Sequence, residues 1–131
     1  MAEARARVAA AREENRKKMR AVGEGTVTKM KVAKDKLELM FEFTNKGDKP
    51  LSQAEGAIAF YDASDTLLKQ IKVPFRQPIA PGKSVSKRGR FPIDKAEDGD
   101  VALAKAKLKD LTLKWMPRLY RFEDGTTMES D

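Results

Sequence analysis

The sequence contains no cysteine and no histidine, and each absence removes whole classes of function. Without cysteine the chain has no disulfide, no thiolate zinc site and no cysteine nucleophile. Without histidine it has no imidazole metal ligand and no Ser-His-Asp triad. Catalysis would have to rely on carboxylates, lysines or hydroxyls. We therefore predict a protein that is not an enzyme, with no cofactor site and no identified metal site. Whether the acidic loops bind a metal stays open.

Long hydrophobic runs are absent as well. No apolar stretch approaches the roughly 20 residues that a membrane-spanning helix requires, so we predict no transmembrane segment. Residues 1–20 alternate alanine with charged residues and lack the apolar region of a signal peptide. The missing cysteines leave the compartment open, the cytoplasm included, because cysteine-free proteins occur in reducing and oxidising compartments alike.

The charge of the chain is concentrated at its start. The 131 residues carry a net charge of +7, and their number suits one domain. Residues 1–22 hold seven basic and three acidic residues, without glycine, proline or aromatics. Because alanine, arginine, glutamate and lysine favour helices, we predict a helix from about Ala2 to Ala21, ended by Gly23 and Gly25. The rest of the chain is close to balanced, so the high pI is weak evidence for a nucleic-acid-binding domain.

From Thr26 onward the apolar residues recur at every second position, which is the period of a strand with one buried face. The clearest strand, Lys36–Thr44, places Leu37, Leu39, Phe41 and Phe43 on one face and is predicted to be central. Further strands are predicted at Thr26–Ala33, Ala54–Tyr61, Leu67–Phe75, Ser84–Phe91, Leu108–Met116 and Tyr120–Phe122, with a last short strand or tail. The predicted core is centred on Phe41, Phe43, Phe60 and Trp115.

The connections between these strands predict the fold class. Glycine, proline and aspartate turns separate the strands, with Pro74 suiting an edge strand and Pro117 ending the strand before it. Asp94–Asp100 is predicted as an acidic loop, and Val101–Ala106 as either a short helical turn or the approach to the next strand. About seven short strands in this arrangement predict an all-β antiparallel sandwich, with a small barrel as the alternative.

Two motifs suggest chemistry but fit turns better. Pro81-Gly82-Lys83-Ser84 resembles the end of a phosphate-binding loop, yet the position that needs the first glycine is Gln77. A β-turn with proline and glycine at its central positions is the favoured interpretation. The acids from Asp94 to Asp100 do not follow the calcium-loop spacing, because Lys105 occupies the twelfth position. A solvated loop is favoured there.

Two basic segments are candidates for partner binding. Lys83, Lys87, Arg88 and Arg90 form a basic strand that could meet phosphates, with Phe91 or Tyr61 stacking on bases. Basic residues on an outward strand also discourage edge-to-edge association, and that structural interpretation is favoured. Pro117–Phe122 interleaves aromatics with arginines. It is either an exposed recognition loop or, the favoured interpretation, a strand that closes the sandwich.

Several short motifs follow one another in a familiar order. They are Phe-Thr-Asn at 43–45, Lys-Pro-Leu-Ser at 49–52, Ala-Phe-Tyr-Asp-Ala at 59–63 and Ile-Ala-Pro-Gly-Lys-Ser at 79–84. In this order the chain resembles the FxLYD-like bacterial immunoglobulin-like domains over roughly half of its length. Asp65 departs from the pattern, because a glycine often stands there, which puts the type of that turn in question. The resemblance implies an immunoglobulin-like fold and a non-catalytic module of an exported or membrane-anchored bacterial protein, such as a periplasmic lipoprotein.

These observations combine into one prediction. Residues 1–22 form a charged helix and residues 23–131 an immunoglobulin-like β-sandwich, acting as an interaction or scaffold module of the bacterial cell envelope. The helix is the spacer or partner contact, and the partner is another protein. If so, deletion of residues 1–22 should leave the melting temperature of the remainder nearly unchanged. The alternative function is binding of nucleic acid or an anionic surface through the basic helix and strand. The predicted partner-binding residues are Arg12, Arg16, Arg20, Arg88, Arg90 and Tyr120.

Overall fold

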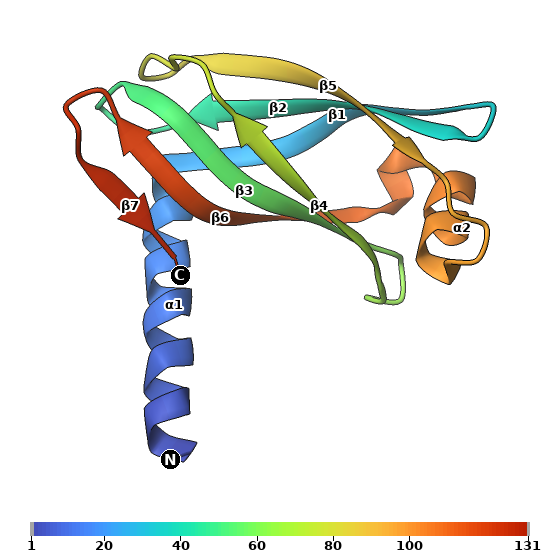
Figure 1. The fold of residues 1–131 in the computed structure, drawn as a ribbon, viewed down its shortest axis with the longest axis horizontal. Coiled ribbons are helices and arrows are strands. Elements are labelled where there is room, and N and C mark those ends of the chain that lie inside the picture. The colour runs from blue at the N-terminus through green and yellow to red at the C-terminus, as the bar shows by residue number, and fades with distance from the viewer. Residues whose placement is uncertain (1, 131) are drawn as a thin grey trace.

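The computed structural model describes residues 2–130, with side chains from residue 5 onward, so Met1 and Asp131 of the predicted segments lie outside it. A long N-terminal helix precedes a body of strands, and a short second helix lies at the far end of that body (Figure 1). The helices are α1 (Ala2–Val22) and α2 (Asp98–Lys105), and a 3₁₀ turn spans Leu108–Asp110. The strands are β1 (Gly23–Ala33), β2 (Lys36–Asn45), β3 (Leu51–Tyr61), β4 (Leu67–Phe75), β5 (Ser84–Pro92), β6 (Thr112–Phe122) and β7 (Thr127–Glu129).

The strands form two antiparallel sheets that face each other (Figure 1). One sheet has the order β1-β2-β5 and the other the order β4-β3-β6-β7. The chain crosses between the sheets from β2 to β3, from β4 to β5 and from β5 to β6. This confirms the predicted immunoglobulin-like antiparallel sandwich, which one N-terminal helix precedes in the chain. The predicted central strand, β2, lies between β1 and β5, and Pro74 lies on the edge strand β4.

The core follows from the alternation of apolar residues along the strands. Phe41 and Phe43 of β2, predicted to face inward, are at most 2% exposed, and Phe60 of β3 is fully buried. The ring of Phe43 lies 5.8 Å from that of Trp115 on the opposite sheet, at an edge-to-face angle of 63°. Such contacts add to the hydrophobic stabilisation of burying large rings. The predicted centre of the sandwich is confirmed.

The loop from Arg76 to Lys83 is fixed by a turn and by one buried amide. The N–H of Lys83 donates to the carbonyl of Ala80 at 3.0 Å, and Gly82 has a φ of +76°. This is the predicted β-turn, of type II, which requires a positive φ at its third residue. The buried Nδ2 of Asn45 donates to the carbonyl of Ile79 at 3.0 Å and to that of Lys49 at 2.9 Å. Asn45 thereby joins this loop to the crossover that leads into β3.

Two local predictions were wrong. Pro117 does not end its strand, because β6 continues to Phe122 through an irregularity in its pairing with β3 that leaves Arg118 unmatched in the register. The acidic loop is shorter than predicted, since α2 begins at Asp98 and buries Leu103. The helical interpretation of Val101–Ala106 is therefore the correct one for most of that segment.

The turn that contains Asp65 accommodates the departure from the family pattern. Asp65 takes the left-handed conformation, with a φ of +62°. Aspartate tolerates this conformation better than most side chains, and glycine adopts it freely. The N–H groups of Ser64 and Thr66 donate to the carboxylate of Asp62 at 2.8 and 2.9 Å, which holds the turn closed.

Helix α1 joins the sandwich through its C-terminal turns. Met19 is fully buried in the core, and Nε of Arg20 donates to the carbonyl of Trp115 at 3.1 Å. The earlier turns project away from the body on the side of the four-stranded sheet (Figure 1). The predicted division at residue 22 therefore matches the end of the helix, but residues before it pack into the core of the sandwich. A deletion of residues 1–22 removes a core side chain, so the expected melting temperature is now lower, not unchanged.

Candidate functional site

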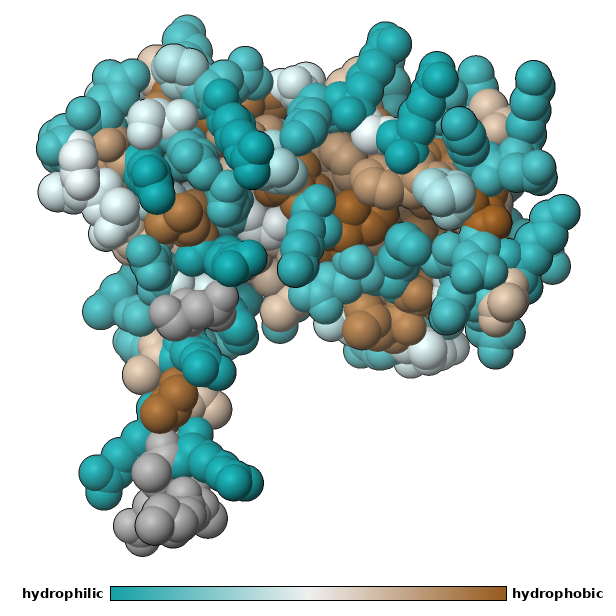
Figure 2. All heavy atoms as spheres, in the orientation of Figure 1, coloured by the Kyte–Doolittle hydropathy of each residue, from teal (hydrophilic) through white to brown (hydrophobic). Residues whose placement is uncertain are grey.

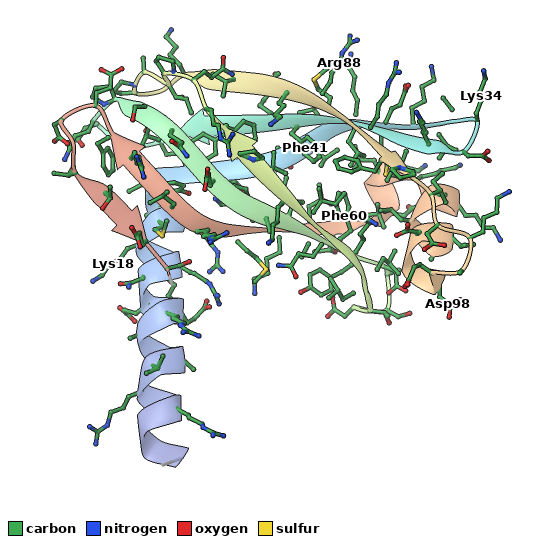
Figure 3. All side chains as sticks on the ribbon, in the orientation of Figure 1. Lys18, Lys34, Phe41, Phe60, Arg88 and Asp98 are labelled. Atoms are coloured by element: carbon green, nitrogen blue, oxygen red, sulfur yellow. The ribbon has the colours of Figure 1, made fainter. Side chains whose placement is uncertain are left out.

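The outer surface of the three-stranded sheet gathers basic side chains from all three of its strands. We define the basic face by five exposed side chains from three strands, Lys29, Lys31, Lys36, Arg88 and Arg90. The strand register brings them together, because Lys29 and Arg88 both pair with Met40, while Lys31 and Arg90 both pair with Glu38. Arg88 points away from the body, whereas Phe41 of the adjacent strand points between the sheets (Figure 3).

The charge on this face is segregated along the strands. Within the two paired rows the acid is Glu38, and its Oε1 lies 3.1 Å from Nε of Arg90. Nearer to Asn45 the same surface carries a second acid, Glu42, which pairs with Thr26 and Ser86. Beyond it lie Thr44 and Ser84, whose hydroxyls are 2.7 Å apart. Outer positions of neighbouring strands are about 5 Å apart, so the cations flank Met40 at short range. Hydrophilic side chains stand along this side of the molecule in Figure 2.

Only part of this face was predicted from the sequence. Arg88 and Arg90 were predicted to bind a partner, but Lys29, Lys31 and Lys36 were missed. The alternation in β1 and β2 contained a signal for them, because a hairpin turn at Lys34-Asp35 pairs these segments. The bulge that leaves Thr28 unmatched and the pairing of β2 with β5 are tertiary features that the alternation does not reveal.

The aromatic residues suggested for base stacking do not line the basic face. Phe91 packs inward with its ring 6.1 Å from that of Phe41, at an angle of 81°. Tyr61 ends β3 in the other sheet and is half-buried. Binding of single-stranded nucleic acid commonly combines a charged groove with aromatic stacking. This face supplies the charge without a stacking platform from either residue.

The predicted arginines of α1 have different surroundings. Arg12 is exposed, whereas Arg16 and Arg20 are half-buried. Glu13 links the latter two, with its carboxylate 3.1 Å from Nη1 of Arg20 and 3.8 Å from Nη1 of Arg16. The hydrogen bond from Arg20 lowers the pKa of Glu13 below its ordinary value. Nη2 of Arg20 is buried without a hydrogen-bond partner among the described residues. Arg20 therefore serves the helix joint, and Arg12 is the freest of the three to reach a partner.

A shallow groove of about 520 Å³ lies where α1 meets the outer surface of the four-stranded sheet. Its floor includes Ala57, and Met116 and Pro117 of β6 also line it. Its lining also includes cationic side chains from the helix and sheet, among them Arg16 and Lys72. The groove has four cations and one acid, Glu55, in its lining, and it lies on the opposite sheet from the basic face.

Tyr120 does not contact a partner, so that prediction was wrong. The side chain is fully buried, and its hydroxyl accepts from Nε1 of Trp115 at 2.8 Å and donates to the carbonyl of Gly23 at 3.1 Å. Burial raises the pKa of the phenol above its ordinary value. The favoured interpretation of Pro117–Phe122, a strand that closes the sandwich, is confirmed.

The acidic side chains near α2 take structural partners. Asp100 accepts from Nζ of Lys69 at 2.7 Å and from the N–H of Asp94 at 3.0 Å. The bond from Lys69 is the largest cause of a lowered pKa at Asp100. Among residues 5–130, whose side chains the structure describes, no group of three or more acidic side chains is close enough together to hold a metal ion. No helix in the same range is long and apolar enough to cross a membrane.

No family model matches the chain, and no curated protein sequence matches it significantly. Among solved structures, a putative ApaA protein from Bordetella pertussis is 15% identical over 82% of this chain and 85% of that chain, with a TM-score of 0.44. A β-glucosidase from Kluyveromyces marxianus is 16% identical over 85% of this chain, with a TM-score of 0.41. The match spans only 14% of that enzyme's chain. Similarities at these scores carry no argument about function.

Proposed function

We propose that this protein is a non-catalytic interaction module in which α1 acts as a rigid stalk for the sandwich. The observation that carries the proposal is the joint between the two parts. Met19 is buried in the core, and Arg20 bonds to both the β6 backbone and Glu13. The turns before Met19 project from the body, and a helix of 21 residues extends for about 30 Å.

The connection between helix and sheet supports rigidity. Strand β1 begins at Gly23 with no linker after Val22, whose carbonyl accepts from the N–H of Lys46 at 2.7 Å. A Cβ at Gly23 would overlap the ring of Phe43, so the backbone at the joint lies directly against the core. Tight packing of this kind restricts hinge motion more than a polar linker would.

Distances between spin labels test the stalk. The chain has no cysteine, so A9C with K31C places labels only on the helix and on the basic face, and K72C with K31C is the control within the sandwich. We expect the helix-to-sandwich distance distribution to be as narrow as the control distribution. A broad distribution, with circular dichroism showing an intact helix, would contradict the stalk role.

The non-catalytic part of the proposal is supported by what the perturbed acids contact. Glu13, Asp100 and Asp124 have lowered pKa values, each caused first by a hydrogen bond from a cationic side chain that fixes a turn or a helix end. Catalytic acids and bases more often have pKa values shifted toward the working pH. These carboxylates therefore have the character of structural groups.

Location in the bacterial cell envelope belongs to the same proposal and rests on the resemblance to FxLYD-like domains. A stalk that precedes an exposed module suits a protein held at a surface by its N-terminal side. Fractionation of cells that express the tagged native gene tests this: we expect the protein in the envelope fractions. Recovery entirely with a cytoplasmic marker would contradict the location and leave the stalk geometry untouched.

A further inference from the structure

The sandwich has four edge strands, and three of them are blocked against further pairing. Strand β1 carries the bulge at Thr28, and β7 is only three residues long. Strand β4 contains Pro74, and α2 packs on it where Gly99 lies directly against the Leu68 carbonyl. Bulges, short length, proline and covering elements are the usual means of protecting sheet edges.

The fourth edge strand, β5, has none of these four protections. Its lysine and arginine side chains discourage pairing with another basic strand, a second copy of β5 included, and do not oppose an acidic one. It is nine residues long and pairs with β2 without a register shift, and its proline, Pro92, stands at the last position. Two hydrogen bonds at its ends set the direction of its backbone groups. The N–H of Ile93 donates to the carbonyl of Asp35, and the carbonyl of Lys83 accepts from Asn45, both at 2.9 Å.

Backbone direction alternates along an antiparallel strand, so odd-numbered residues of β5 bond to β2. The N–H and C=O groups of Ser84, Ser86, Arg88 and Arg90 consequently point away from β2. Among the described residues no hydrogen bond from another segment reaches these groups. They form a regular, unpaired row along the edge of the sheet.

The charge beside this open edge selects the partner. The side chains of Arg88 and Arg90 lie on the basic face, and the segment from Lys83 to Pro92 contains no acid. A strand added beside β5 would place every second side chain next to these arginines, at about 5 Å between Cβ atoms. Acidic residues two positions apart would therefore pair with both arginines at once.

We infer that the open edge of β5 binds an extended acidic segment of a partner protein as an added strand. The inference rests on the proposed role as an interaction module and specifies its contact surface and partner class. Main-chain hydrogen bonds to the even-numbered residues give the affinity, and acids two positions apart against Arg88 and Arg90 give the specificity. The regular row of N–H and C=O groups matches a peptide backbone, and the inward packing of Phe91 leaves no platform for bases.

The probe is a fluorescent nine-residue peptide that alternates glutamate with threonine, titrated into the full chain and followed by anisotropy. Two further peptides carry N-methyl groups on every second amide, one peptide on the odd-numbered amides and the other on the even-numbered amides. Each keeps the charge of the parent and loses the N–H donors along one of its two edges. We expect one of these peptides to bind at least tenfold more weakly than the parent and the other to bind similarly. Equal binding by all three peptides, or no binding by the parent, overturns the inference.

Variants of the protein give the complementary test. S86P removes one edge N–H and leaves both the charge and the pairing with β2, while S86A is the matched control that keeps the N–H. We expect S86P to bind the peptide at least tenfold more weakly than S86A, and R88Q/R90Q to weaken binding as well. If S86P lowers the melting temperature, the N-methylated peptides with the unmodified chain decide the question.

Competing partners are separated in the same assay. A single-stranded oligonucleotide or an anionic lipid vesicle that binds more tightly than the peptide, with no difference between S86P and S86A, overturns the inference in favour of a polyanion. Failure of the edge leaves the spin-label distances of the stalk unchanged. A mobile helix, in turn, leaves peptide binding at β5 unchanged, so the two proposals fail separately.

Discussion

At the scale of single residues, one buried hydroxyl joins the two sheets of the sandwich. Tyr120 of β6 accepts from Trp115 and donates to the carbonyl of Gly23 at the start of β1. The variant Y120F leaves a buried donor and a buried acceptor without partners, so we expect a loss of about 1–3 kcal/mol in the free energy of unfolding. Urea denaturation measures it, with Y61F, at a half-buried position, as the control that should change little.

Asp124 gives a residue-scale prediction about pH. Nζ of Lys49 lies 2.8 Å from its carboxylate, and that contact, followed by the hydrogen bonds from Thr126, holds the pKa of Asp124 well below the ordinary range. Its contribution to stability is therefore present above the pKa of an unfolded aspartate, about 3.9, and is lost as the pH falls toward the lowered value. Carboxyl NMR titration should find Asp124 still ionised at pH 3. An ordinary midpoint there, or one unaffected by K49M, contradicts this.

The residue scale also shows where alternation predicts burial and where it does not. Phe41 and Phe43 were placed in the core correctly because β2 pairs on both sides without losing its phase at either residue. Alternation did not predict the burial of Tyr120. The irregularity at Arg118 shifts β6 by one residue, so the buried positions change from odd-numbered to even-numbered residues. A one-residue shift exchanges the two faces of a strand, so a bulge invisible in the sequence decides which aromatic is buried.

At the scale of elements, α1 has one fully buried side chain, and that side chain dominates its contribution to stability. Met19 is fully buried, so M19A should cost about 2–5 kcal/mol in the free energy of unfolding. V8A is the control, because Val8 is 50% exposed, and should change stability by less than about 0.5 kcal/mol. A chain that starts at residue 15 should keep the melting temperature, while one that starts at residue 23 should lose stability. Equal melting temperatures for the two truncated chains would contradict this and would support the expectation from the sequence that residues 1–22 do not affect the stability of the sandwich.

The second helix gives an element-scale prediction in which two effects oppose each other. Alanine in place of a helical glycine usually stabilises by about 1 kcal/mol. At Gly99, however, a Cβ would overlap the carbonyl of Leu68 in β4, a backbone group that cannot move aside easily. We expect the clash to win and G99A to be destabilised by about 1–3 kcal/mol in thermal unfolding. A102G, at an exposed position of the same helix, measures the propensity effect alone.

Helix α2 is an element that the sequence alone could not predict clearly. Its eight residues are too few for a persuasive helical period, and it contains Gly99 and two aspartates that favour turns. Packing of Leu103 into the core and the bond from Lys69 to Asp100 stabilise it. Strand β4, in contrast, was predicted with the bounds it has, because its alternating Ile71, Val73 and Phe75 are clear without tertiary information.

At the scale of the whole molecule, the two charged regions point to different sides. The basic face lies on the outer side of the three-stranded sheet, and α1 extends on the side of the other sheet (Figures 1 and 3). Composition predicted the basic helix but found the rest of the chain nearly balanced. That balance hides a local excess, because strand pairing gathers lysines and arginines from β1, β2 and β5 onto one surface.

The direct passage from α1 into β1 makes the helix a mechanical handle. In Figure 1 the helix axis runs across β1, so a load on the stalk pulls across the length of β1 and opens its pairs with β2 one at a time from Gly23 and Asn45. A load at the Lys34 tip pulls along the strands and must break many hydrogen bonds together. Single-molecule pulling with handles at A9C and K114C should therefore unfold the sandwich at a lower force than handles at K34C and K114C. Tension on the stalk thus separates β1 before it reaches β5, so the edge strand farthest from the handle within that sheet keeps its shape longest under load.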